Sequence, residues 1–472
     1  MVKLREPLDQ LLRLPQTFTS HLSFPDPKRI SLYDDTLRDG EQMPGVAFSP
    51  QQKLELANLL AEIGVDVMDV AFPISSASDQ EALKLILEAR RSGKIRDDVE
   101  ILAMCRAVQG DIDVVLRVVK EAGCQPGDVS VLILSTLSDL HLKYKLGRTL
   151  LKREQRLESE WLGTSLSFYR EANIRMICGA IDYARTQGIE QIEFAAEDAS
   201  RSDLDYAIEW ANACQLAGGT RFCFSDTCGV FTPEGVDHYF PAIVDTLGVR
   251  DGKLDLTAHF HNDFGLGAIN TVRAVMHGAT HPSLTANGIG ERAGNTSLHQ
   301  FVMVLKELYG VTLPGFKYAR LQELRNAVER ASGIPIQPHE PIIGEGVFSH
   351  ESGLHTAAIL VHPAIYQFIH EQDVGGTQRF VFGKHSGGSA IEEVLKKHER
   401  LLAAQGVVLS EDLVKQTLER IKELRESQID TGFSRRAVED YYSNYQKLGI
   451  DEAALIELVL EITKAPTPVS TD

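Results

Sequence analysis

The chain lacks the features of a membrane or secreted protein. The sequence contains no run of about 18 apolar residues, the length that a helix needs to span a bilayer. The first residues, Met1–Glu6, lack the apolar core of a signal peptide. The six cysteines form no CxxC pair and no dense framework. We therefore expect reduced thiols and a cytoplasmic protein without a membrane partner.

Positive charge is also scarce. The 48 lysines and arginines are outnumbered by 66 aspartates and glutamates, so the formal net charge is -18. This balance argues against a surface for nucleic acid, and we predict no nucleic-acid partner. An anionic substrate would have to be held by local cations or by a metal. With 472 residues, 43% of them hydrophobic, the chain can form one large domain and one or two smaller ones.

Short β-branched runs alternate with helix-like segments along the first 290 residues. One such helix is predicted at residues 51–63, where Ser49, Pro50 and Gln52 form a start signal. Eight strand–helix units indicate an α/β protein with a (β/α)₈ TIM barrel. A doubly wound open sheet is the alternative, but no GxGxxG motif follows the first run. The predicted strands are Ile30–Tyr33, Val65–Ala71, Glu100–Met104, Val129–Leu134, Gln191–Phe194, Arg221–Phe224, Leu254–His259 and Ser283–Asn287.

Changes of pattern divide the chain further. Between residues 143 and 175 the sequence is long and charged, which predicts an extended helix or a lid. After the barrel, a Pro/Gly-rich stretch and helical periodicity predict a smaller, mainly helical C-terminal region. The predicted parts are an N-terminal extension (1–27), the catalytic barrel (28–312), a linker and post-barrel subdomain (313–390), a helical C-terminal subdomain (391–464) and a disordered tail (465–472).

Two histidines, His259 and His261, lie one residue apart in a predicted strand. Side chains alternate along a strand, so both imidazoles leave the same face and suit a divalent transition metal. A pair of partly exposed polar residues at a strand end is the other interpretation. Polar residues also gather where the other predicted strands end, as an active site built from βα loops requires. They include Asp35–Gln42, Arg106, Ser135–Asp139, Glu197–Arg201, Asp226, Thr227 and Asn287–Asn295.

Three of these motifs carry a family resemblance. The run Asp35–Gln42 (DTLRDGEQ), the HFHND run from His259 and Asn287–Asn295 (NGIGERAGN) resemble the signatures of the 2-isopropylmalate and homocitrate synthases. These are acyltransferases of the DRE-TIM metallolyase group. The resemblance covers about residues 28 to 400, because His350–His355 and Phe382–Gly387 resemble the family's post-barrel subdomain.

The resemblance implies a metal centre and a reaction. Asp39, His259, His261 and Asn295 match the metal-ligand positions, and this set suits Mg, Mn, Zn or Co. A 2-oxo acid would chelate the metal, which would polarise its carbonyl, while Arg38 would stabilise charge on that oxygen.

Further roles follow from the resemblance. His355 matches the base that activates acetyl-CoA, and Glu197 would orient it or relay protons. The family offers this histidine to a partner's barrel, which implies a homodimer with exchanged C-terminal subdomains. Gln42 and Thr227 match positions near the metal and the substrate. Two further substrate-binding candidates, Arg106 and His141, come from the predicted loops, and Gly383–Gly387 would contact CoA phosphates or only turn the chain.

The implied activity is a Claisen condensation of acetyl-CoA with a 2-oxo acid, followed by thioester hydrolysis to a 2-alkylmalate-type product. Homocitrate, citramalate and (Re)-citrate synthases are alternatives, and a lyase of the hydroxymethylglutaryl-CoA type is a less favoured one. Glu193, on the fifth strand, would repel a distal carboxylate, and Ala195 and Ala196 offer no donor. We therefore expect a neutral, small or branched 2-oxo acid such as 2-oxoisovalerate. The short C-terminal region argues against a separate regulatory domain.

Overall fold

A computed structural model describes residues 16–429, 433–445, 449, 450 and 452–464. These residues fall into two compact units. One contains Ala47–Gly333 and the residues before Pro44, and the other contains Pro44–Val46 and the chain from Ile334 onward. Across the described residues, no helix is both long and apolar enough to cross a membrane. The predicted four-part division after residue 27 stays a prediction, and the predicted tail (465–472) lies outside the described residues.

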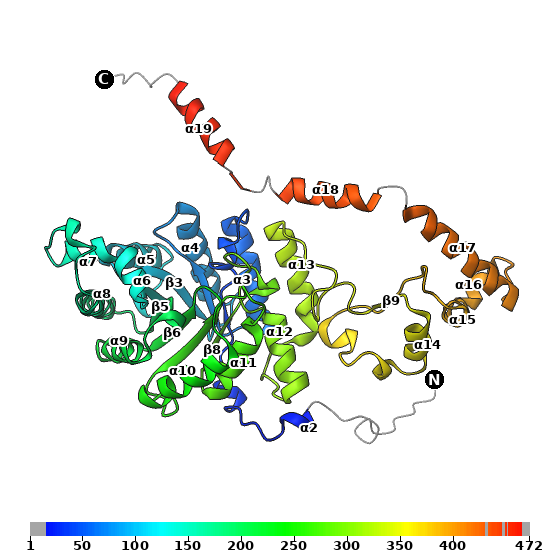
Figure 1. Cartoon of the computed structure of the whole chain (residues 1–472), viewed down its shortest axis with the longest axis horizontal. Helices are drawn as coiled ribbons and strands as arrows, with labels where there is room; N and C mark the ends of the chain where they lie inside the picture. Colours follow the sequence, from blue (N-terminus) through cyan, green and yellow to red (C-terminus); the bar gives the residue numbers. More distant parts are fainter. Residues whose placement is uncertain (1–15, 430–432, 446–448, 451, 465–472) are drawn as a thin grey trace. The chain divides into compact units, whose positions relative to one another are not determined.

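The first unit is the predicted TIM barrel. Eight parallel strands close in sequence order, with β1 pairing both β2 and β8. Helices surround the strands (Figure 1). Every strand therefore ends at the same mouth, which confirms the predicted fold class. The strands are β1 (Tyr33–Asp34), β2 (Val67–Ala71), β3 (Glu100–Arg106), β4 (Ser130–Thr136), β5 (Ile192–Glu197), β6 (Arg221–Asp226), β7 (Asp255–Phe260) and β8 (His281–Leu284).

Several helices of this unit begin at polar caps. Helix α3 (Pro50–Ile63) has the predicted capping box, in which Ser49 and Gln52 bond each other's backbone N–H. Likewise, the Thr232 side chain caps α10 (Pro233–Thr246). The other barrel helices are α4 (Ala77–Arg91), α5 (Gln109–Glu121), α6 (Asp139–Tyr144), α7 (Gly147–Arg153), α8 (Leu166–Thr186), α9 (Leu204–Leu216), α11 (Gly267–His277), α12 (Leu298–Met303) and α13 (Leu321–Ser332).

Every predicted strand differs from the observed one at one or both ends, and the differences are clearest at β8, β5 and the segment 143–175. β8 begins at His281, two residues before the predicted start, and contains Pro282. β5 continues to Glu197 instead of ending at Phe194. The charged segment 143–175 forms the end of α6, then α7, a 3₁₀ turn (Glu158–Glu160) and the start of α8.

Two layers fill the barrel below its mouth. The upper layer is mostly apolar and includes Tyr33, Leu132, Ala195 and Cys223. Below it, the buried Arg221 guanidinium pairs with Glu100 at 2.7 Å and with Glu193 at 2.5 Å. Packing and ion pairs thus fill the barrel below its carboxyl-terminal mouth.

The second unit is mainly helical, as expected. Its only regular strands among the described residues are the short parallel pair β9 (Ser349–His350) and β10 (Arg379–Phe380). The predicted motif Gly383–Gly387 turns the chain here, because the Ser386 hydroxyl accepts the Gly383 N–H and donates to the Glu351 carbonyl. The helices are α14 (Gly353–Val361), α15 (Gly388–Lys397), α16 (Glu399–Ala404), α17 (Glu411–Ile429), α18 (Phe433–Tyr445) and α19 (Glu452–Lys464).

Candidate active site and metal centre

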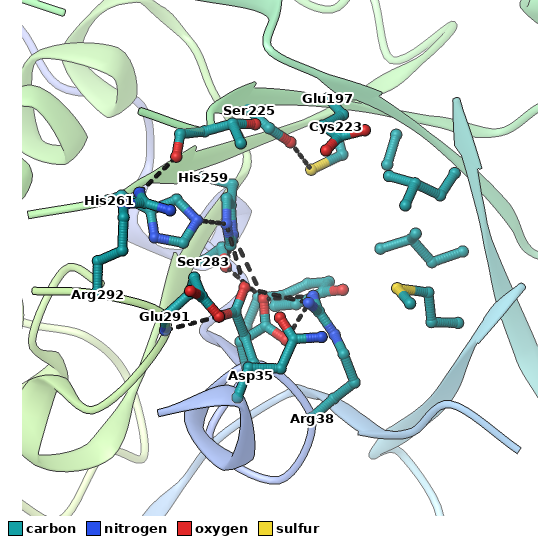
Figure 2. Close-up of a pocket in the computed structure, with 18 residues that line it drawn as sticks. Asp35, Arg38, Glu197, Cys223, Ser225, His259, His261, Ser283, Glu291 and Arg292 are labelled. Atoms are coloured by element: carbon teal, nitrogen blue, oxygen red, sulfur yellow. Dashed lines mark hydrogen bonds and ion pairs between the residues drawn. The ribbon is translucent and has the colours of Figure 1, made fainter. Parts of the chain in front are cut away.

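A cavity of about 380 Å³ opens at the barrel mouth. One side of its wall, from β6, β7, β8 and the turn after β1, is polar, and the other, from β3, β4 and β5, is largely apolar. Figure 2 shows the polar side chains gathered around His259. The polar lining comprises Asp35, Arg38, Asp39, Gln42, Glu197, Ser225, Thr227, His259, His261, Ser283, Glu291 and Arg292, and the rest comprises Tyr33, Met104, Leu132, Leu134, Ala195 and Cys223.

Three of the predicted metal ligands meet at this mouth. Ligand atoms of Asp39, His259 and His261 all lie within 4.8 Å of one another. The His259 Nε2 atom is 3.3 Å from His261 Nε2 and 3.5 Å from Asp39 Oδ2. All three residues are buried. One carboxylate and two imidazoles facing one point form a donor set suited to a divalent transition metal.

The predicted fourth ligand, Asn295, lies next to this cluster. It forms an isolated backbone bridge with His261. Within the described structure, neither atom of its buried side-chain amide has a hydrogen-bond partner, and neither does His261 Nδ1. Buried polar atoms left unpaired are costly, and coordination of a cation by the amide oxygen would satisfy that atom. The residues present therefore fit the implied metal.

Glycines in the Asn287–Asn295 run shape the loop that carries this asparagine. Gly294 has a φ of +81°, and a Cβ there would lie 1.9 Å from the Gly288 carbonyl oxygen. A Cβ on Gly290 would lie 2.6 Å from the Asn295 side-chain oxygen. Only glycine fits these positions without a shift of the backbone or of the asparagine, so the glycines allow the loop to pack closely around Asn295.

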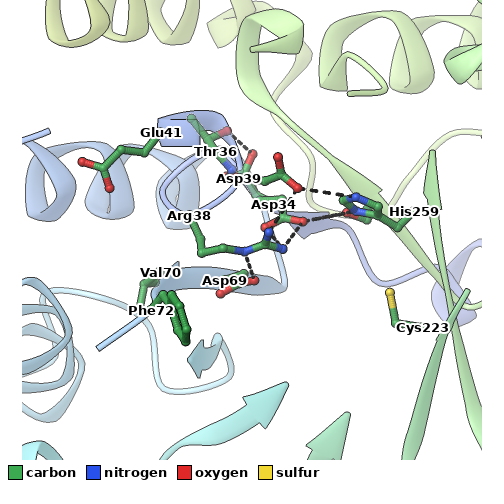
Figure 3. Close-up of polar contacts among 12 residues, drawn as sticks. Asp34, Thr36, Arg38, Asp39, Glu41, Asp69, Val70, Phe72, Cys223 and His259 are labelled. Atoms are coloured by element: carbon green, nitrogen blue, oxygen red, sulfur yellow. Dashed lines mark hydrogen bonds and ion pairs between the residues drawn. The ribbon is translucent and has the colours of Figure 1, made fainter. Parts of the chain in front are cut away.

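Arg38 lies at the centre of a carboxylate cluster (Figure 3). Its Nε atom is 2.7 Å from Asp69, Nη1 is 3.1 Å from Asp39, and Nη2 is 2.8 Å from Asp35. The turn itself is tight, because the Asp35 carbonyl accepts the N–H groups of both Asp39 and Gly40. One guanidinium facing three buried carboxylates leaves an excess of negative charge that favours a second cation here.

The pKa shifts reflect this excess. Burial raises the pKa of Asp69, and neighbouring Asp35 raises it further despite Arg38. Burial also opposes ionisation of Asp35, but Arg38 and His259 lower its pKa to about 2. Burial and His259 lower the pKa of His261 to about 4, so its imidazole is neutral near pH 7 and available as a ligand.

Glu197 lines the cavity from the end of β5. The Lys145 ammonium pairs with its carboxylate, and the His141 Nδ1 atom lies 3.9 Å from Oε2. His141 also lies 3.5 Å from Asp198. The charged segment after β4 thus contacts the lining residue Glu197 through His141 and Lys145, although neither of these two residues lines the cavity.

The remaining predicted site residues are distributed unevenly. Gln42 and Thr227 line the cavity, and the Thr227 hydroxyl accepts the Asp198 N–H at 2.8 Å. Arg106 does not line it, because its guanidinium turns to Asp111 and is 59% exposed. His355 belongs to the second unit, where it is exposed on α14 and its ring stacks on Tyr366 at 4.0 Å.

The expectation that Glu193 would repel a substrate carboxylate is wrong. Glu193 is buried below the cavity, where Arg221 neutralises it. The residues of β5 that line the cavity are Ala195 and Glu197. Glu193 lies four residues before the end of β5 at Glu197, which places it one layer deeper in the barrel than Ala195.

Sequence reasoning also missed several lining residues. Ser225 and Ser283 are the register partners of His259 on β6 and β8. A further residue that was missed, Asp69, is a lone carboxylate in the otherwise apolar β2 and pairs with Arg38 instead of lining the cavity. Because side chains alternate along a strand, every second residue before each strand end faces the barrel interior, and this rule identifies the two serines and the apolar wall. Lys145 lies on no strand, so the rule does not identify it.

Comparisons with known proteins identify the family of this chain. Residues 29–328 match the HMGL-like family, and residues 342–429 match the homocitrate synthase post-HMGL domain-like family. A 2-isopropylmalate synthase of Sulfurisphaera tokodaii is 35% identical over 85% of this chain and 92% of its own length. A homocitrate synthase of Methanopyrus kandleri is 36% identical over 85% and 89%.

Other matches extend the group. An (R)-citramalate synthase of Methanocaldococcus jannaschii is 35% identical over 84% of this chain and 70% of its own. A hydroxymethylglutaryl-CoA lyase structure from Pseudomonas aeruginosa has a TM-score of 0.50 and 17% identity over 66% of this chain and 95% of its own, which shows the shared barrel alone. The chain belongs to the HMGL-like family of DRE-TIM enzymes, in the group of the 2-isopropylmalate, citramalate and homocitrate synthases.

Proposed function

We propose that this protein condenses acetyl-CoA with a neutral, branched or small 2-oxo acid such as 2-oxoisovalerate, and hydrolyses the thioester to give a 2-alkylmalate and CoA. Family membership supports the condensation with a 2-oxo acid. The relatives act on different 2-oxo acids by name at nearly equal identity, so the choice of substrate rests on the cavity.

The apolar wall carries this choice. In a closed eight-stranded barrel, β3, β4 and β5 face β7, β8 and β1. A 2-oxo acid whose keto and carboxylate groups meet Arg38 and the ligand cluster therefore directs its side chain at Met104, Leu132, Leu134 and Ala195. Such a surface favours an aliphatic side chain, at about 25 cal/mol for each Å² buried.

A distal carboxylate would find no free cation here. Among the described lining residues the arginines are Arg38, surrounded by carboxylates, and Arg292, which pairs with Asp263 at 2.8 Å. The Lys145 ammonium near the mouth is likewise already paired, with the carboxylate of the lining residue Glu197. Burying an unpaired carboxylate costs several kcal/mol, which disfavours oxaloacetate and 2-oxoglutarate.

The chain's own residues have distinct roles in this reaction. Asp39, His259, His261 and Asn295 would hold a divalent ion, which supplies Lewis-acid polarisation of the 2-oxo carbonyl. A base removes a proton from the acetyl methyl group, and the carbanion attacks the 2-oxo carbon to form one C–C bond. Arg38 stabilises the charge that grows on the keto oxygen until a proton neutralises it. Water then cleaves the thioester to a carboxylate and the CoA thiol.

We assign His355 as the base and Glu197 as the group that orients it, and we infer a homodimer that exchanges its C-terminal subdomains. The resemblance of His350–His355 to the family's post-barrel motif and the exposure of His355 support this assignment. Mixing inactive Arg38→Ala and His355→Ala chains under verified subunit exchange should restore about a quarter of parental turnover, since half of the dimers are mixed and each holds one intact site. No recovery would point to a site built within one chain.

A thiol-release assay tests the substrate. With acetyl-CoA and Mg, Mn, Zn or Co present, turnover on 2-oxoisovalerate should exceed turnover on 2-oxoglutarate and oxaloacetate at matched concentrations. Faster turnover on either dicarboxylate would overturn the substrate choice and favour the homocitrate or citrate alternative. Cleavage of a hydroxymethylglutaryl-CoA substrate without any condensation would favour the lyase alternative.

A further inference from the structure

We propose that Asp35 is a positioning residue that couples the metal-binding imidazole of His259 to the guanidinium of Arg38. The inference rests on the proposed metal centre, but it does not depend on which 2-oxo acid is condensed. Asp35 immediately follows β1 and is 1% exposed. Its carboxylate lies between the two groups, on the polar side of the cavity (Figure 2).

One oxygen of Asp35 faces His259. The Ser283 hydroxyl lies 2.9 Å from His259 Nδ1 and donates to Asp35 Oδ2 at 3.2 Å. The same Oδ2 atom is 3.3 Å from His259 Nδ1. Because His259 Nε2 faces Asp39 and His261, Nδ1 is the nitrogen left for these partners.

This arrangement fixes the imidazole for coordination. A ligating histidine must present a lone pair on Nε2, so its proton must be on Nδ1. The Ser283 hydroxyl accepts a hydrogen bond from Nδ1–H and donates its own to the Asp35 carboxylate. This chain of hydrogen bonds favours the tautomer protonated on Nδ1 and fixes the orientation of the ring. Partners of this kind raise metal affinity about 10- to 100-fold.

The same carboxylate holds Arg38. The Nη2 atom of Arg38 lies 2.8 Å from Oδ1 and 2.9 Å from Oδ2 of Asp35. A guanidinium has five N–H groups, and Asp69, Asp39 and Asp35 each take one, on Nε, Nη1 and Nη2. One N–H on each terminal nitrogen remains for a substrate oxygen. Without Asp35, the Nη2 atom of Arg38 loses the carboxylate that fixes its position.

Experiments can separate the effect of Asp35 on His259 from its effect on Arg38. We would prepare Asp35→Asn, Ser283→Ala and a control, Asp34→Asn. Asp34 is equally buried, but its carboxylate accepts from the N–H and hydroxyl of Thr36, and the residue does not line the cavity. Thermal unfolding checks that each variant folds, Mn or Zn titration of the metal-free protein gives affinity, and thiol release at saturating metal gives kcat.

Asp35→Asn should bind the metal about 10- to 100-fold more weakly and should keep a kcat deficit of about tenfold or more at saturating metal. Ser283→Ala should lose metal affinity but recover kcat when metal saturates, since Arg38 keeps its anchor. Asp34→Asn should match the parent in both measurements.

A folded Asp35→Asn protein with parental metal affinity, or with parental kcat at saturating metal, would overturn the coupling. If Asp35→Asn does not fold, unchanged metal affinity in Ser283→Ala would overturn it instead. A parent protein that binds no metal would refute the proposed function itself, and this result needs no substrate to be seen.

Discussion

Replacement of Arg38 should damage stability and catalysis to different extents. Arg38→Met removes the guanidinium that faces Asp35, Asp39 and Asp69 at 2.7 to 3.1 Å. Its side chain is only 10% exposed, so water cannot take over the carboxylates. Removing one partner of a buried ion pair costs about 3–5 kcal/mol, and we expect a loss of that size in the free energy of unfolding.

Arg38→Lys separates charge from geometry. The ammonium still neutralises the cluster, so most of the stability should remain. Lysine lacks the planar fork, however, and cannot contact the carboxylates while directing two N–H groups at the cavity. Loss of a donor to the developing oxyanion typically lowers kcat about 10²- to 10³-fold, and we expect this loss for Arg38→Lys.

Urea unfolding at pH 7 and thiol release measure the two effects. Arg273→Met provides a matched control, because Arg273 pairs with Asp237 between α10 and α11 at a site that is 31% exposed. It should lose under about 1 kcal/mol and keep its turnover. An Arg38→Met protein no less stable than this control, or an Arg38→Lys protein with parental kcat, would refute the role given to the cluster.

Three other perturbations have defined outcomes. His259→Ala should abolish most turnover, because the lost ligand removes several kcal/mol of transition-state stabilisation by the metal. Atomic emission should find less metal bound to this variant, and a parental metal content would exclude His259 as a ligand. Lys53→Met should cost about 3–5 kcal/mol in urea unfolding, because the buried Lys53 ammonium pairs with Glu41 and Asp79 at 2.6 and 2.7 Å. Burial, with help from a neighbouring arginine, lowers the pKa of His281 to about 3, so below pH 6.5 only the unfolded chain takes this proton. Between pH 6.5 and 4 the parent should therefore lose up to about 1.4 kcal/mol per pH unit more than His281→Gln, and parallel stability curves would contradict this.

Local periodicity was enough to predict the barrel and the shared face of His259 and His261. His259 and His261 share a face wherever their strand begins or ends, so an error in its bounds did not matter. Asp39 and Asn295 lie in loops whose sequence resembles the family, and the structure brings both to the same mouth.

Depth within the barrel could not be predicted in the same way. Glu193 is buried below the cavity and Ala195 lines it, and the difference depends on strand length and on the register between strands. The direction of a long side chain is equally non-local, since Arg106 turns toward Asp111 on the following helix. The contacts of Asp35 form only when β8 closes against β1 and brings Ser283 to it.

A competition experiment tests the central proposal most directly. The metal-loaded protein would receive acetyl-CoA with an equimolar mixture of 2-oxoisovalerate, pyruvate, oxaloacetate and 2-oxoglutarate, and mass spectrometry would identify the products. The apolar wall formed by Met104, Leu132, Leu134 and Ala195 predicts that 2-isopropylmalate accumulates first. The proposed metal centre predicts that chelation of the metal stops its formation. Accumulation of homocitrate or citrate first, or product formation in thoroughly metal-free protein, would contradict the account.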